Sequence, residues 1–268
     1  MKTKFYYYDE QNDDFANLNI KTKKIDDSYE YLPKNFFYCF FKPLVYYLVL
    51  VLVCIIELFY LRGFIKNRKV LRKVKHQGYF VYGNHTSAIN DAFSTPYTSF
   101  PKQVYIIANP DSTSIKGITT LVRFLGALPL PNTKRNYISF YRTIEKLIKK
   151  RKVIAIYPEA HIWPKYNKIR DFPIASFNYP VKLNAPCFAK TTIYKKKKNG
   201  KTKPVIYLDG PFYPDKDLPF KKAQKKLRDE VYNAMNKRVQ QHNSSLDKDY
   251  EYIKVNSPEE VRTEKSKF

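Results

Sequence analysis

The strongest constraint on the fold is an apolar run from Leu44 to Leu61, in which 13 of 18 residues are Leu, Ile, Val or Phe and Glu57 is the one charge. As a helix rising 1.5 Å per residue, the run would be about 27 Å long, close to the roughly 30 Å hydrocarbon core of a bilayer. Its apolar side chains favour insertion by about 4–8 kcal/mol, whereas Glu57 costs about 3 kcal/mol or less near one end. The run therefore predicts a membrane segment.

We expect this membrane segment to cover residues 36–62, but its course within the bilayer stays open. It could cross the membrane or lie in one leaflet, and the aromatic run Phe36–Phe41 before Pro43 would allow a second short membrane-facing piece. A buried core helix is the alternative interpretation. Soluble helices seldom stay apolar on all sides over such a length, so the membrane interpretation is favoured.

Basic residues are unevenly distributed around the apolar run Leu44–Leu61. Seven follow it, namely Arg62, Lys66, Arg68, Lys69, Arg72, Lys73 and Lys75, and three occur in the comparable stretch before it, namely Lys24, Lys34 and Lys42. The positive-inside rule therefore predicts that the following domain lies on the cytoplasmic face of the membrane.

The whole chain carries 49 Lys and Arg against 24 Asp and Glu, a formal charge of +25, which favours an anionic partner such as a lipid surface or nucleic acid.

The chain beyond the membrane segment predicts an α/β domain with a mixed sheet flanked by helices. Short apolar runs bounded by Gly, Pro, Asn or Asp predict strands at 78–82, 103–108, 153–157, 187–194 and 204–208. Helical spacing of apolar residues predicts helices at 137–152 and 218–241. We expect this domain to cover residues 63–245, with polar tails at 1–35 and 246–268. The three cysteines, Cys39, Cys54 and Cys187, support neither a disulfide framework nor a zinc site, so no metal is expected.

The first polar cluster of interest is "GNHTSAIND" (83–91), at the end of the strand expected at 78–82. His85 could act as a general base if an acid held its ring, and Asp91 is the candidate acid. Six residues apart on one helix, the two would point about 240° away from each other, so His85 must precede the helix. The alternative is that Thr86 or Ser87 caps the helix and Asn84 braces the turn.

The second cluster is "YPEAHIWP" (157–164), at the end of the strand expected at 153–157. Sites in α/β sheets are built at the carboxyl ends of strands, which makes Glu159 a candidate functional residue. His161 and Trp163 could be packing residues instead.

The two clusters together resemble the glycerolipid acyltransferase family, which includes the 1-acylglycerol-3-phosphate acyltransferases. Its first block is Asn-His-x4-Asp, its third Phe-Pro-Glu-Gly-Thr-Arg and its fourth an apolar run around Val-Pro. This sequence has Asn84-His85, Tyr157-Pro158-Glu159 about 70 residues later, and Ala185-Pro186 before an apolar run, all behind the membrane segment.

The sequence departs from the family pattern at several positions. Strict spacing places Asn90 opposite His85, with Asp91 one residue late, and we expect Asp91 to be the partner because an amide cannot supply a negative charge. The family's Arg of the third block is replaced by Ile162, and Arg170 could substitute for it. Lys134 and Arg135 fall a few residues late for the second block.

The resemblance implies an O-acyltransferase of phospholipid synthesis that uses no bound cofactor. It would move a fatty acyl group from acyl-CoA or acyl-carrier protein to the free hydroxyl of a lysophospholipid, with 1-acylglycerol-3-phosphate as the leading acceptor. His85 and Asp91 would be catalytic. The implied substrate-binding residues are Asn84, Ser87, Lys134, Arg135, Glu159, His161 and Arg170. Glu159 would hold a hydroxyl or a neighbouring Arg in place, while Lys134 and Arg135, with Arg170 as a further candidate, would receive the phosphate of the acceptor.

Two rival interpretations remain at this point. One is a membrane-tethered nucleic-acid-binding protein, which the charge would suit, although the sequence has no recognisable nucleic-acid-binding motif and we expect no nucleic-acid partner. The other is an acyltransferase-like protein that has lost its activity.

Overall fold

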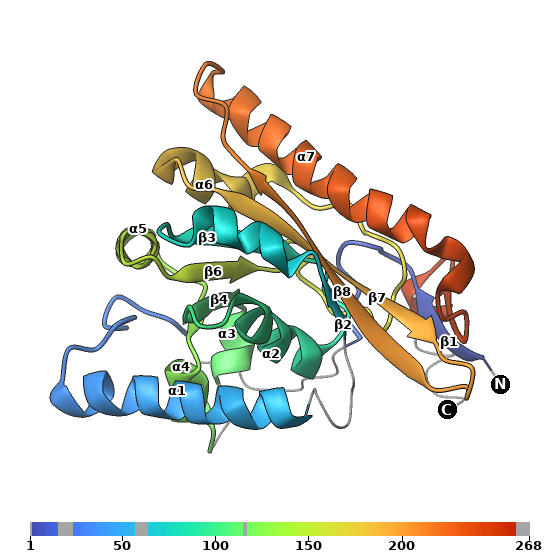
Figure 1. Cartoon of the computed structure of the whole chain (residues 1–268), viewed down its shortest axis with the longest axis horizontal. Coiled ribbons are helices and arrows are strands. Elements are labelled where there is room, and N and C mark those ends of the chain that lie inside the picture. The colour runs from blue at the N-terminus through green and yellow to red at the C-terminus, as the bar shows by residue number, and fades with distance from the viewer. Residues whose placement is uncertain (1, 16–23, 57–63, 115–116, 261–268) are drawn as a thin grey trace.

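The computed structural model describes residues 2–15, 24–56, 64–114 and 117–260, and its centre is a mixed sheet with strand order β2-β8-β7-β3-β6-β4-β5 (Figure 1). The pair β7–β8 is antiparallel and the other neighbours are parallel. The strands are β2 (Phe64–Lys66), β3 (Tyr79–Gly83), β4 (Val104–Ala108), β5 (Ala127–Pro129), β6 (Val153–Ile156), β7 (Cys187–Lys196) and β8 (Thr202–Phe212).

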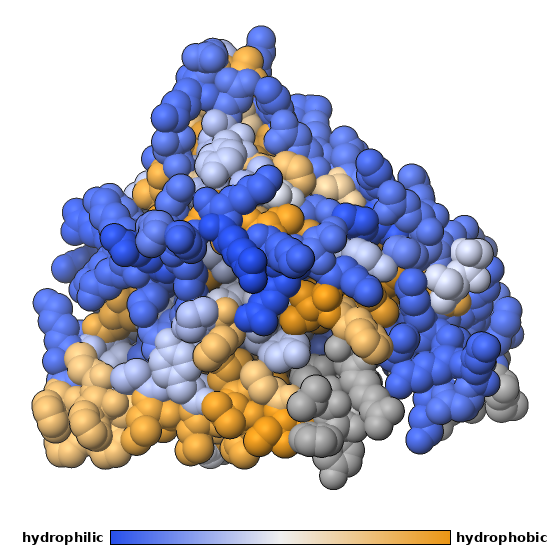
Figure 2. All heavy atoms as spheres, viewed as in Figure 1, coloured by the Kyte–Doolittle hydropathy of each residue, from blue (hydrophilic) through white to orange (hydrophobic). Residues whose placement is uncertain are grey.

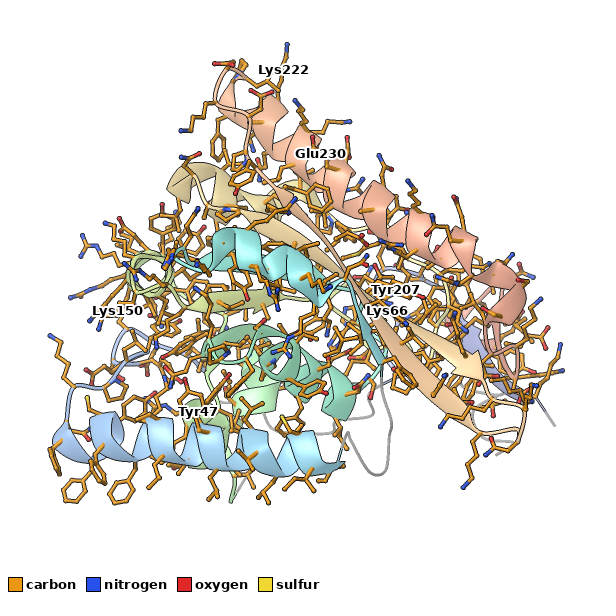
Figure 3. All side chains as sticks on the ribbon, viewed as in Figure 1. Tyr47, Lys66, Lys150, Tyr207, Lys222 and Glu230 are labelled. Atoms are coloured by element: carbon orange, nitrogen blue, oxygen red, sulfur yellow. The ribbon has the colours of Figure 1, made fainter. Side chains whose placement is uncertain are left out.

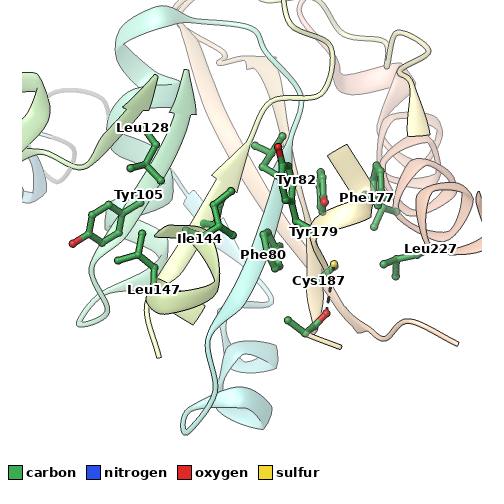
Figure 4. Close-up of a cluster of buried hydrophobic side chains, with 14 of the residues drawn as sticks. Phe80, Tyr82, Tyr105, Leu128, Ile144, Leu147, Phe177, Tyr179, Cys187 and Leu227 are labelled. Carbon is green, nitrogen blue, oxygen red and sulfur yellow. Dashed lines mark hydrogen bonds between the residues drawn. The ribbon is translucent and has the colours of Figure 1, made fainter. Parts of the chain in front are cut away.

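Helices cover both faces of this sheet. They are α1 (Phe36–Ile56), α2 (Ala88–Ser99), α3 (Pro110–Thr113), α4 (Thr119–Phe124), α5 (Lys134–Lys149), α6 (Asn178–Leu183) and α7 (Phe220–Gln241), with 3-10 helices at Arg68–Val74, Ile174–Phe177 and Asn243–Ser245. Side chains alternate along β3. Phe80 and Tyr82 pack with residues of α5 and α7 in the larger core (Figure 4), and Tyr79 and Val81 pack on the other face with the 3-10 helix Arg68–Val74.

The α/β prediction is confirmed, because each of the five expected strands overlaps an observed strand and both expected helices form as α5 and α7. The prediction succeeds because the central strands are buried. The strands β3 and β6 are buried at every residue, and a continuous β-branched or aromatic run is the sequence pattern of a strand covered on both faces.

The predicted membrane segment is one helix where it is described, and the aromatic run Phe36–Phe41, which left a second piece open, is part of that helix. Helix α1 runs from Phe36 through Pro43 to Ile56, since a proline removes one backbone donor but does not prevent a helix from continuing at that point. It is the one described helix long and apolar enough to cross a membrane. Glu57 and residues 58–62 lie outside the described residues.

The two predicted polar tails are corrected in part, because their described ends pair with each other. Strand β1 (Thr3–Tyr7) and strand β9 (Tyr250–Lys254) form a parallel pair in which Phe5 stands opposite Tyr252. Their aromatic rings stack at 4.9 Å, and Tyr252 stacks in turn on the buried Trp163 at 5.0 Å. Alternating aromatic residues therefore order segments whose high content of polar residues predicted exposed tails.

Candidate active site

The residues of the two polar clusters meet at one edge of the sheet. Strands β3 and β6 are adjacent and parallel, so the loops that follow them lie side by side. His85 lies in the loop between β3 and α2, and Ser87 caps α2 with its Oγ accepting from the Asn90 N–H at 3.2 Å. This loop placement is the one that lets His85 and Asp91 meet across six residues.

Asp91, and not Asn90, contacts the ring of His85. The His85 Nδ1–Asp91 Oδ2 distance is 2.9 Å, and the same oxygen accepts from the backbone N–H groups of Thr86 at 2.8 Å and Ser87 at 3.0 Å. Asp91 is 1% exposed, and the His85 side chain is 18% exposed. With Nδ1–H donating to the carboxylate, Nε2 is the nitrogen left to accept a proton. The side chain of Asn90 has no hydrogen-bond partner among the described residues.

Two buried side chains that the sequence reasoning missed complete this cluster. Lys190, on β7, donates from Nζ to Ser94 Oγ at 2.6 Å and to the Tyr157 hydroxyl at 3.0 Å, and lies 4.0 Å from Asp91 Oδ1. Tyr157 stacks on the His85 ring at 4.8 Å, and its burial and the nearby Asp91 carboxylate raise its pKa, so the phenol stays protonated. A lone Lys inside the apolar run 187–194 was the available signal.

Glu159 and Arg170 form a buried pair behind His85. Glu159 Oε2 accepts from the His85 N–H at 3.0 Å and lies 3.4 Å from Arg170 Nη2, and its Oε1 accepts from the Arg170 N–H at 3.1 Å. Burial raises the pKa of Glu159, while Arg170 and the two N–H donors lower it in part. This arrangement matches the expectation that Glu159 would hold a neighbouring Arg.

The expectation that Arg170 receives a phosphate is corrected by its burial. Arg170 is 2% exposed and donates to the carbonyls of Glu10 and His161, and its guanidinium lies 4.9 Å from the Trp163 ring. Its place in the sequence, in a polar stretch after the third block, suggested an accessible cation. The N-terminal segment and Trp163 cover it instead.

Three other expected substrate-binding residues have structural partners. Asn84 is buried and bridges to β7, since its Nδ2 donates to Thr192 O at 2.9 Å and its Oδ1 accepts from Thr192 N at 2.8 Å. Ser87 is the helix cap described above. His161 is partly exposed, with its Nδ1 3.4 Å from Asp14 Oδ2. Asn84 and Ser87 thus follow the capping and bracing alternative.

Lys134 and Arg135 lie at the same sheet edge as His85 but beside a different strand. They form the exposed first turn of α5, which follows β5. Three strand spacings, roughly 14 Å, separate β3 from β5. Arg135 lines a hollow of about 700 Å³ together with Arg142 and Lys146. The role of Lys134 and Arg135 toward an acceptor phosphate stays a prediction.

No group of three His, Cys, Asp or Glu is placed to hold a metal within the described ranges.

We predict that Glu159→Gln lowers the free energy of unfolding by about 3–5 kcal/mol, because it leaves the Arg170 charge buried without its partner. The double variant Glu159→Gln/Arg170→Met removes both charges and should recover much of this loss. Denaturant unfolding of the purified protein in detergent measures both. A single variant as stable as the unmodified protein would contradict the buried ion pair, as would a double variant less stable than the single one.

Comparison with known proteins agrees with this geometry. A protein-family model described as Acyltransferase matches residues 65–214, which hold β3, β6 and all the site residues named above. The crystal structure of the 1-acyl-sn-glycerophosphate (LPA) acyltransferase PlsC from Thermotoga maritima superposes with a TM-score of 0.50 at 16% identity, over 69% of this chain and 74% of that one. No curated protein sequence matches. Because the family model covers more than half of the chain, the protein belongs to the acyltransferase family.

Proposed function

We propose that the protein is a membrane-bound O-acyltransferase that acylates the free hydroxyl of a lysophospholipid in phospholipid synthesis, with 1-acylglycerol-3-phosphate as the leading acceptor. Acyl-CoA or acyl-carrier protein is the donor, and no bound cofactor is required. The observation that carries the proposal is the 2.9 Å contact of His85 Nδ1 with buried Asp91, beside Glu159 at the same strand ends. The family supports the reaction class, and the fold shared with PlsC supports a glycerolipid acceptor.

The proposed reaction needs one proton carrier. His85 Nε2 takes the proton of the acceptor hydroxyl while that oxygen attacks the carbonyl carbon of the thioester. The tetrahedral intermediate then expels the thiolate, which takes the proton from His85 and leaves as the thiol. Asp91 keeps the ring oriented and stabilises the imidazolium that exists between the two steps.

Lys190 limits how strongly Asp91 favours that imidazolium. Its ammonium faces the Asp91 oxygen that does not contact His85, so the buried pair is close to neutral before the reaction. Tyr157 is neutral, and Glu159 is directed at the backbone N–H of His85 and at Arg170. Lys190 therefore offsets part of the negative charge that Asp91 presents to His85.

Helix α1 supports attachment to one leaflet rather than a crossing of the membrane. One face packs on the domain, with Lys42 Nζ donating to the Tyr105 hydroxyl at 2.8 Å and the Tyr46 hydroxyl accepting from Val104 N at 2.9 Å. Its other face exposes large apolar side chains, namely Phe36, Phe37, Phe40, Phe41, Leu44, Leu48, Val51, Leu52, Ile55 and Ile56. Figure 2 shows this face as the apolar band along the lower side of the molecule.

The residues just before α1 contact the same domain as the residues after it. Ile25 and Tyr31 are buried in the larger core, Ile25 N donates to Asn132 Oδ1 at 2.9 Å, and the Tyr31 hydroxyl donates to Pro129 O at 3.1 Å. A spanning helix would place these partners on opposite sides of the bilayer. We propose the cytoplasmic leaflet, because its anionic lipids would attract the chain's positive charge.

We predict that His85→Ala removes at least the 10²–10⁴-fold that a positioned general base contributes. Membranes carrying the protein or the variant are incubated with radiolabelled acyl-CoA and 1-acylglycerol-3-phosphate, and the labelled product is quantified. His76→Ala serves as the matched control, because this exposed histidine precedes β3 and lies at the opposite end of that strand from His85. Equal, background-level product with the unmodified protein and with His85→Ala would refute the enzyme proposal.

We predict that Lys190→Met lowers the free energy of unfolding by about 3–5 kcal/mol, because it leaves the buried Asp91 carboxylate without the cation that faces its Oδ1. Lys196→Met, on the same strand but half-exposed, removes a surface ion pair and should cost about 1 kcal/mol or less. Denaturant unfolding of the purified proteins in detergent measures both changes. Equal stabilities of the two variants would contradict the buried contact.

We predict that the segments before and after α1 are accessible from one and the same side of the membrane. Single cysteines at Lys4 and Lys222, both exposed, are introduced into a chain carrying Cys39→Ser and Cys54→Ser. A membrane-impermeant maleimide should label both positions, or neither, in sealed vesicles of a given orientation. Labelling of one position alone would show that α1 crosses the bilayer.

A further inference from the structure

A positively charged pocket lies at the opposite edge of the sheet from the candidate active site. It has a volume of about 380 Å³, and five cations line it: Arg68, Lys69, Arg72, Lys75 and Lys102. No Asp or Glu lines the pocket, and none of the five forms an ion pair with a carboxylate of the described residues. A concave surface with this much uncompensated charge favours an anion.

Hydrogen bonds to backbone carbonyls hold part of this pocket in place. Arg68 donates from Nε to Thr98 O at 3.0 Å and from Nη2 to Phe100 O at 2.9 Å. Lys102 donates from Nζ to the carbonyls of Gln77 at 2.6 Å and Arg151 at 3.0 Å. The cations at these positions are therefore fixed by the fold.

The remaining titratable and polar groups of the pocket add no negative charge. Burial raises the pKa of Tyr79 to about 12, so its phenol is neutral at physiological pH. Burial and the positive charges of Arg151 and Lys152 lower the pKa of Lys102, which is the response of a lysine that lacks a counter-ion. Ser99, a buried hydroxyl residue, also lines the pocket and could donate to an anion.

The pocket is joined to the membrane-facing helix. The Tyr47 hydroxyl of α1 donates to the carbonyl of Pro101, a residue of the pocket wall, at 2.9 Å. Figure 3 shows Tyr47 on the side of α1 that faces the domain. Phe100, in the same wall, is 49% exposed and apolar. The cations thus lie beside a helix whose outer face is suited to lipid.

We propose that this pocket binds the phosphate group of an anionic phospholipid in the leaflet that holds α1. The inference rests on the membrane attachment proposed above, but not on the reaction. Tyr79 begins β3 and His85 follows its end, so the pocket and the active site are separated by at least the length of that strand, roughly 13 Å. The bound lipid is therefore a positioning ligand of the membrane surface and not the acceptor in the act of acylation.

The test compares binding of the full-length protein to phosphatidylcholine vesicles with binding to vesicles that also contain phosphatidylglycerol. Arg72→Gln/Lys75→Gln should reduce the preference for anionic vesicles about 100-fold, since each charge-assisted hydrogen bond to a bound phosphate contributes about tenfold or more. Binding to phosphatidylcholine alone should not change. Lys66→Gln/Lys73→Gln is the matched control, because these exposed lysines remove the same charge from the same region without lining the pocket.

Four outcomes decide the proposal. A large loss in the pocket variant and a small one in the control supports it. Equal losses would show non-specific attraction to net charge and overturn it. Titration with inorganic phosphate and with CoA tests the soluble sources of phosphate. If Arg72→Gln/Lys75→Gln still prefers anionic vesicles but no longer binds one of these soluble ligands, the proposal is also overturned. Weak binding of every protein to every vesicle would refute attachment through α1. His85→Ala should keep the full preference for anionic vesicles, because lipid binding does not depend on the reaction.

Discussion

The arrangement of the candidate active site depends on one buried carboxylate. Asp91 Oδ2 contacts the His85 ring and two backbone N–H groups, and Asp91 Oδ1 faces the ammonium of Lys190. A carboxylate at this depth is stable only because of such partners. They fix the loop before α2, which in turn fixes His85. The same crowding explains Gly83, since a Cβ there would lie 2.7 Å from Tyr157 Cε1 and 3.1 Å from Lys190 Cε.

The second loop is tied to the first by the same kind of contact. Glu159 accepts from the His85 N–H, and two backbone bonds join the loops, from Trp163 N to His85 O at 3.0 Å and from Lys165 N to Thr86 O at 3.1 Å. The buried guanidinium of Arg170 balances the charge of Glu159. The third-block segment therefore supports the loop that holds His85. A chain that lacks the family's Arg at Ile162 can still build that support, because Arg170 reaches Glu159 from further along the chain.

The sequence predicted what burial and local spacing determine. Continuous apolar runs identified the central strands, and the carboxyl-end rule placed His85 and Glu159 at one edge of the sheet. The choice of Asp91 over Asn90 followed from the need for a negative charge. What sequence could not supply was long-range pairing. Lys190 is separated from Asp91 by 99 positions, and the parallel pairing of β1 with β9 joins the two ends of the chain. Composition alone predicted tails at those ends.

Helix α1 shows why its apolar run alone could not decide between a crossing and a surface helix. Hydropathy averages over all sides of a helix, whereas the informative residues are Lys42, Tyr46 and Tyr47, each of which bonds the domain through a polar group. A composition count includes tyrosine among the hydrophobic residues, yet the hydroxyls of Tyr46 and Tyr47 form hydrogen bonds with the backbone of the domain. The helix therefore contacts two environments, protein on one side and, as proposed, lipid on the other. A helix held in this way fixes the orientation of the whole domain relative to the membrane surface, and the basic pocket beside Tyr47 would add a second point of attachment that a single apolar helix does not provide.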